Sequence, residues 1–280
     1  MSPDETIVLF VTAGFGIQGW YRWYKRLGRL SGFRMPPYLK PVLALLPLGA
    51  LGCLFCVLRR FASADVRSDA FYLAYYAVFG AAWLVWILEL SERVLGVSPA
   101  LDAMERRNPA AILMTAGILL GGAACFSGGN IGDGPGWWCV AFASGLATAF
   151  WMGLWAVLER VAHVSDAVTV ERDAWAGLRM GAFLLATGLI CGNAAAGDWF
   201  GFLPTVVDFA KDAWPALILA AVALPLEWLR SRRPLTDGNP WAAVSVILSV
   251  AYVAAAAFAV YRLAASMENP LYGLPPLEKP

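Results

Sequence analysis

Charged side chains inside apolar segments are the residues of this 280-residue chain with the most potential for chemistry. Arg179 lies within an apolar run, where an arginine costs several kcal/mol unless it is paired or reaches water. Three glutamates, Glu89, Glu159 and Glu227, each lie near the end of another apolar run. These residue types could line a polar pathway for a solute or an ion.

Two arrangements are open for Arg179. It lies six residues after Asp173, about 9 Å into a helix, so its long stem could carry the guanidinium back to the membrane surface. Alternatively it pairs with a glutamate inside the bundle, which would mark a pathway. Glu159 is the predicted partner, because it ends the apolar segment immediately before that of Arg179.

The remaining candidate pathway residue is Asn193, about 40° around the same helix from Arg179 and roughly 21 Å along its axis. The glutamates themselves have two interpretations. They are either interfacial carboxylates, solvated or paired with the arginines that follow them, or a ring of acids around a cytoplasmic vestibule.

Enzymatic and metal chemistry have little support in the sequence. His163 is the only histidine, and no serine or cysteine is arranged with it as a nucleophile. Cys53 and Cys56 form a C-x-x-C pair without a second pair of ligands, so we interpret all five cysteines as small apolar residues. The loop 127–138 has five glycines but no lysine for phosphate binding, and we interpret it as a flexible hairpin. We predict no catalytic residue, metal or cofactor.

Glycines follow one face of the helix that carries Arg179. Gly177, Gly181, Gly188 and Gly192 fall within about 60° of one another at 100° per residue, a pattern that allows close helix packing in membranes. Gly117 and Gly121 form the matching pair on an earlier helix. We predict that the two stripes touch, and that Gly132→Ala in a loop has little effect.

The elements that must position these residues are membrane helices. Hydrophobic residues make up 60% of the chain and charged residues 15%, a composition typical of integral membrane proteins. Spanning the hydrocarbon core takes about 20 apolar residues. Eight segments qualify, the first being the weakest: 6–21, 41–58, 70–90, 109–128, 136–158, 174–196, 206–228 and 241–262.

Basic residues and tryptophans predict the orientation. The loops after the odd-numbered segments hold fourteen of the 21 lysines and arginines, against six on the other side and Arg179 within a segment. The positive-inside rule therefore predicts both termini outside, and tryptophans gather at the predicted ends of the helices. The pair Arg59–Arg60 opposes this assignment for the first hairpin. The formal net charge of +1 excludes a large basic surface for nucleic acid.

A two-helix pattern repeats along the chain. A helix ends near a tryptophan and a glutamate, a polar loop follows, and the next helix begins at Asn108-Pro109, at Asp173 or at Asn239-Pro240. Asparagine and aspartate cap free N–H groups, and proline suits the first helical position. Because two helices return the chain to the same side, the copies would be parallel. We therefore predict an all-α polytopic membrane bundle of about eight transmembrane helices built from parallel two-helix repeats.

Residues 70–199 resemble the YjfL-type inner-membrane family, catalogued as domain of unknown function 350. The resemblance lies in Asn108-Pro109-Ala110-Ala111 followed by AGILLGG, and in Ala176-Gly177 followed by MGAFLLATGLICGNAAAGDW. It implies four membrane helices, a bacterial inner-membrane location and an association with envelope functions. It implies no mechanism.

The predicted division of the chain is an N-terminal hairpin (1–69), the four-helix domain (70–199), a C-terminal hairpin (200–262) and an exposed proline-rich tail (263–280). The favoured function is a non-enzymatic inner-membrane component of an envelope-associated assembly. The alternative is a small-solute or ion permease or channel with its pathway near Arg179. The expected partners are the lipid bilayer and either a second copy of the chain or another membrane protein. Convergence of Arg179 and the glutamates on a polar cavity would favour the permease.

Overall fold

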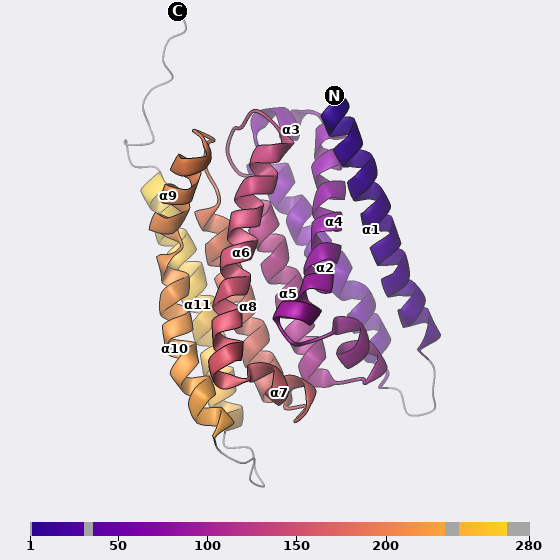
Figure 1. Cartoon of the computed structure of the whole chain (residues 1–280), viewed down its shortest axis with the longest axis vertical. Coiled ribbons are helices and arrows are strands. Elements are labelled where there is room, and N and C mark those ends of the chain that lie inside the picture. The colour runs from indigo at the N-terminus through magenta and orange to yellow at the C-terminus, as the bar shows by residue number, and fades with distance from the viewer. Residues whose placement is uncertain (1, 31–35, 233–240, 268–280) are drawn as a thin grey trace, which may run out of the picture.

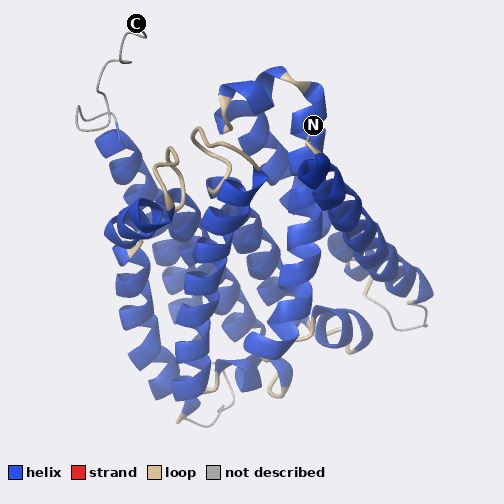
Figure 2. Cartoon of the chain, turned by 45° about the horizontal axis from the view of Figure 1, so that its top comes forward, coloured by secondary structure: helices blue, strands red, loops and turns tan. Residues whose placement is uncertain are grey.

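The described part of the chain is all-helical. The computed structural model describes residues 2–30, 36–232 and 241–267. Figure 2, with helices in blue and loops in tan, shows that the connections are confined to the two ends of a helical bundle. The helices are α1 (Pro3–Arg29), α2 (Leu39–Phe61), α3 (Ala64–Ser68), α4 (Ala70–Val94), the π-helix η1 (Pro99–Glu105), α5 (Pro109–Gly128), α6 (Trp137–Ala162), α7 (Val164–Thr169), α8 (Ala174–Ala194), α9 (Phe202–Asp212), α10 (Trp214–Ser231) and α11 (Trp241–Met267).

The long helices lie side by side and run up and down the bundle (Figure 1). In the described residues, six of them are long and apolar enough to cross a membrane, namely α2, α4, α5, α6, α8 and α11. The pair α9–α10 counts as a seventh if its two helices form one span. This arrangement is consistent with a membrane protein, and the predicted count of eight remains a prediction.

Helix α1 accounts for the difference between seven and eight spans, because it is not among the candidate spans. It is 27 residues long and packs along α4. Gly19 allows this approach, because a Cβ there would collide with the side chain of Val85, whereas one at Gly16 would lie at an ordinary contact distance of 3.5 Å from Ala82. The Trp20 indole also donates a 3.1 Å hydrogen bond to the carbonyl of Ala81. The charged residues at both ends of α1 leave a shorter apolar run than in the other long helices.

The predicted span 206–228 is wrong in its boundaries and its continuity. The chain forms α9 up to Asp212 and restarts as α10 at Trp214, with a bend of 48° between the two helices. Pro215 lies in the first turn of α10. Because proline has no N–H and disfavours helical geometry in the preceding residue, it ends one helix and starts the next.

The polar loops that the sequence predicted before α5 and α8 each contain a short helix. They contain η1 and α7, and they end in the same way. Arg107 and Arg172 both have φ of 55°, and the next residue in each case caps the following helix. The N–H of Asn108 bonds the carbonyl of Asp102, and that of Asp173 bonds the carbonyl of Ala167. The predicted third helix start, Asn239-Pro240, lies outside the described residues, as does most of the predicted tail.

The loop 127–138 is held in place, contrary to its interpretation as a flexible hairpin. The carbonyl of Ile131 accepts a 2.9 Å hydrogen bond from Gly197, and that of Asp133 accepts a 2.8 Å bond from Trp199. Gly132 has φ of 106°, and a Cβ there would lie 2.3 Å from the carbonyl oxygen of Gly197. The expectation that Gly132→Ala has little effect is therefore wrong.

Helices α5 and α8 form the middle of the bundle. α5 contacts α2, α4, α6 and α8, and the other side of α8 packs against α11. The predicted contact between the glycine stripes is present. A Cβ at Gly117 would lie 2.2 Å from the Gly181 carbonyl oxygen, and one at Gly188 would lie 2.4 Å from Cα of Gly121. Gly177 and Gly192 similarly approach the backbone of Ala110 and Ala124. This contact fixes how α8 is rotated, and thereby where its opposite face points.

Candidate functional site: a buried ion pair joining three helices

Arg179 lies in the second turn of α8, on the side away from α5. Its side chain is 1% exposed, so the guanidinium does not reach solvent along the helix. Placing a guanidinium in such surroundings is costly unless a carboxylate and further acceptors surround it. The structure supplies both.

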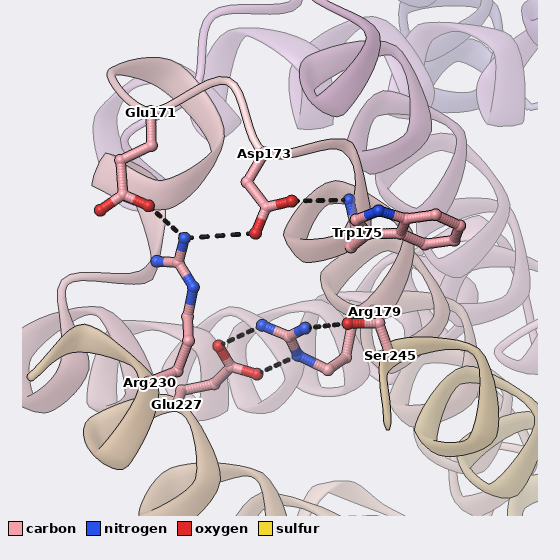
Figure 3. Close-up of polar contacts among 7 residues, drawn as sticks. All are labelled: Glu171, Asp173, Trp175, Arg179, Glu227, Arg230 and Ser245. Carbon is pink, nitrogen blue, oxygen red and sulfur yellow. Dashed lines mark hydrogen bonds and ion pairs between the residues drawn. The ribbon is translucent and has the colours of Figure 1, made fainter. Parts of the chain in front are cut away.

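The partner of Arg179 is Glu227, on α10. Figure 3 shows the two side chains meeting side-on. Nε of Arg179 lies 2.5 Å from Oε1 of Glu227, and Nη2 lies 2.8 Å from Oε2. Two parallel N–H···O bonds of this kind define the relative orientation of the two groups as well as their distance. Glu227 is 2% exposed.

A third helix completes the site. Nη1 of Arg179 donates a hydrogen bond to the hydroxyl of Ser245 on α11. Next to this contact, the ring of Phe183 on α8 packs edge-to-face on that of Tyr252 on α11, with centroids 5.7 Å apart. The Tyr252 side chain is 2% exposed, and its hydroxyl has no hydrogen-bond partner among the described residues. A single guanidinium therefore connects α8, α10 and α11.

A second arginine contact joins α10 to the start of α8, with the arginine now on α10. Arg230, three residues after Glu227 on α10, pairs with Glu171 and lies 3.3 Å from Oδ2 of Asp173. Oδ1 of Asp173 accepts a 3.0 Å bond from the backbone N–H of Trp175 and so caps α8 (Figure 3). Thus α8 and α10 each carry an arginine that pairs with a carboxylate on, or just before, the other helix. The positive and negative charges of the buried side chains therefore nearly cancel.

This arrangement can hold helices together but has little capacity for acid–base chemistry. The Glu227 carboxylate is engaged by two N–H groups, and the Arg179 guanidinium stays protonated in proteins. In surroundings of low dielectric constant, opposite charges at this distance attract strongly, and a lone charge would be very unfavourable. We therefore call Arg179, Glu227 and Ser245 the clamp, because together they hold α8, α10 and α11 to one another.

Glu159, the predicted partner of Arg179, is engaged elsewhere. Its Oε2 accepts a 2.8 Å bond from the N–H of Ser165, and its Oε1 accepts a 2.6 Å bond from the Ser165 hydroxyl. Between them His163, with φ of 47°, turns the chain from α6 into α7. The prediction of Glu159 was wrong because this turn brings Ser165 back to the end of its own helix.

The other two candidate pathway residues also lie apart from Arg179. Glu89 is exposed and lines a cavity of about 260 Å³ bounded by α1, α4 and η1, together with Arg22 and Arg26. Asn193 lies near the far end of α8, and its side-chain nitrogen is buried with no hydrogen-bond partner in the part of the chain that the structure describes. The three glutamates therefore do not form a ring, and Arg179 is not among the residues lining this cavity.

Histidine and cysteine contribute no metal site in the described residues, where no three potential ligands converge. Cys125, Cys139 and Cys191 are buried, as expected for small apolar residues. Cys53 and Cys56 are instead exposed on α2, on a face that the sequence alone did not distinguish.

Ser245, Arg230 and Tyr252 are the members of the site that the sequence did not indicate as such. Glu227 and Arg230 are three residues apart on α10, which places both on one face of that helix. A glutamate and an arginine at this spacing, against an aspartate and an arginine on α8, were a detectable signal for two crossed ion pairs. No such signal marks Ser245 or Tyr252.

Comparison of the chain with family models, curated proteins and solved structures gives no match.

Proposed function

We propose that this chain is a non-enzymatic multi-pass membrane protein that acts as a component of a membrane assembly. The observation that carries the proposal is the separation of the pathway candidates. Glu227 pairs with Arg179, Glu159 accepts hydrogen bonds from Ser165, and Glu89 lines a separate cavity between α1, α4 and η1. A permease would be expected to bring such groups to a common polar cavity. An association with the bacterial envelope rests on the resemblance to the YjfL-type family.

The proposed topology has eight crossings in parallel two-helix units, with both termini outside. One support is the path of α1 along α4. The other is that Arg107–Asn108 and Arg172–Asp173, two segments 65 residues apart in the sequence, have equivalent geometry. The N-terminus and the end of α11 lie at the same end of the bundle (Figure 1), as an even number of crossings requires.

Two measurements on one preparation test this function. The protein is extracted with its surrounding lipid, and its mass is measured by native mass spectrometry. We expect a complex of defined composition heavier than a single chain. The same material in proteoliposomes should give no more flux of Na⁺, K⁺, Cl⁻ or protons than empty liposomes. A lone chain with flux that Arg179→Ala abolishes would refute the proposal.

One observation favours the alternative, a permease. The span α9–α10 is broken, and Pro225 lies two residues before Glu227 in its second part. Interrupted helices carry the ion and substrate sites of many transporters. In that case the Arg179–Glu227 pair would be a closed gate, and Glu227→Gln would change the flux without abolishing folding.

A further inference from the structure

A second cavity, of about 480 Å³, lies at the end of the bundle where the N-terminus is found. It is lined by the loops that follow α5 and α8, by the region of α3 and the start of α4, and by α9. Its volume is in the range of small-molecule sites. It is separate from the Arg179 clamp, which involves none of its lining residues.

The wall of this cavity is strongly acidic. None of its described lining residues is a lysine, arginine or histidine. Six of them are carboxylates: Glu5, Asp65, Asp133, Asp198, Asp208 and Asp212. Some are engaged, since Asp208 pairs with Lys211 and Asp198 accepts a bond from the Asp133 backbone. The carboxylates of Asp65, Asp133 and Asp212 accept no hydrogen bond from the described residues, so the cavity favours a cation.

Two buried polar side chains point to a ligand independently of the acids. Tyr76 is 7% exposed and Asn130 is 6% exposed, and both line the cavity. The Asn130 amide donates to the Phe126 carbonyl, while its oxygen accepts no hydrogen bond within the described chain. The Tyr76 hydroxyl has no partner there either. Both residues line the cavity, and neither atom is among the buried polar atoms sealed off without a partner, so the two groups are available to a molecule in the cavity.

The acids of this cavity do not gather around one point. Divalent metals need several oxygens around one point, and in the described residues no three such side chains converge. The carboxylates are instead spread around the wall, beside the rings of Tyr72, Tyr76 and Trp199. Aromatic faces attract organic cations, and separated acceptors suit a ligand with several N–H groups.

We propose that this cavity binds a small organic cation with N–H donors, of the alkylguanidinium or primary alkylammonium class. Asp65, Asp133 and Asp212 supply the charge, and the Asn130 oxygen and the Tyr76 hydroxyl receive N–H groups. This binding function goes beyond the assembly role and holds whether or not the ligand is moved across the membrane.

Calorimetric titration of the full-length protein in lipid nanodiscs tests the site, with methylguanidinium as the probe. We expect saturable binding with a dissociation constant of about 1 mM or tighter. Asp65→Asn, Asp133→Asn and Asp212→Asn together should weaken it at least about tenfold, and Tyr76→Phe should weaken it severalfold. Glu89→Gln, in the other cavity, is the matched control and should leave it unchanged. Thermal unfolding of each variant verifies that the fold is kept.

Tetramethylammonium, which has the charge but no N–H donor, should bind clearly more weakly than methylguanidinium. Equal affinity for the two cations would overturn the assignment, as would binding that survives the triple substitution. Displacement of methylguanidinium by Mg²⁺ at similar concentration would show a metal site instead. An absence of saturable binding would refute the proposal without affecting the assembly role, which native mass measures separately.

Discussion

Arg179 and Glu227 illustrate why a buried charge pair is conditional. Each group is nearly inaccessible, and each is acceptable only because the other is present. Replacing a whole buried pair by apolar groups is often tolerated, whereas removing one member leaves a stranded charge. Stability measurements on single and double variants therefore report on the pair directly.

We predict that Arg179→Ala lowers the free energy of unfolding in detergent by about 3–5 kcal/mol, because it leaves Glu227 buried and unpaired. Arg179→Ala with Glu227→Ala should cost much less than the sum of the single changes. Arg179→Ala with Glu159→Ala is the control, and its effects should add. Additive behaviour of both pairs would contradict the buried ion pair.

The hydroxyl of Ser245 should matter in the same way on a smaller scale. Ser245→Ala removes one acceptor from the Arg179 guanidinium, and a lost bond to a charged group costs about 1.5–3 kcal/mol. Ser249→Ala, one turn later on α11, is the matched control because its hydroxyl donates to the backbone carbonyl of Ser245 and to no other group in the described residues. Equal thermal shifts for the two variants would argue against a role for Ser245 in the clamp.

Among the helices, α8 is the element on which the clamp depends, since each of its two faces packs against other helices. One face meets α5 through glycines, and the other carries Arg179 toward α10 and α11. The glycine contact leaves no freedom to rotate α8, because backbone lies directly against backbone. The position of the ion pair therefore follows from small residues on the opposite side of the same helix.

Substitutions at the glycine contact should separate close-packed from open positions. Gly181→Ala and Gly188→Ala place a Cβ within 2.5 Å of backbone atoms of α5, so we predict a loss of about 1–3 kcal/mol each. Gly153→Ala on α6 is the control, because no atom lies within 4 Å of its Cβ position. Urea or thermal unfolding in detergent measures both. Similar behaviour at all three positions would contradict the packing.

At the scale of the whole molecule, the property to test is its orientation in the membrane. In a variant with exposed Cys53 and Cys56 replaced by alanine, we predict that Ser2→Cys reacts with a membrane-impermeant maleimide added to intact cells. Ser231→Cys, at the opposite end of the bundle, should react only after permeabilisation, because its loop is rich in arginine. The reverse pattern would invert the topology. Lys279, a further position for labelling, lies outside the described residues.

Much of the helical architecture was predictable from composition and local chemistry. Apolar runs of about 20 residues must form helices in a lipid environment, since every backbone polar group needs a partner within the segment. Asn108 and Asp173 marked helix starts correctly, because capping depends on residues two or three positions away. The glycine spacing likewise indicated the contact between α5 and α8, because the periodicity of a helix places those residues on one face.

The partner of Arg179 could not be predicted in this way. Glu159 is near in sequence, but the chain turns at His163 and Ser165 engages its carboxylate. Glu227 is 48 residues away and pairs with Arg179 because α10 packs beside α8 with that face turned inward. The cavity at the N-terminal end is likewise assembled from α3, α4, α9 and two loops. Local patterns decide which segments are helical, whereas pairs and cavities depend on which helices become neighbours and how each is rotated.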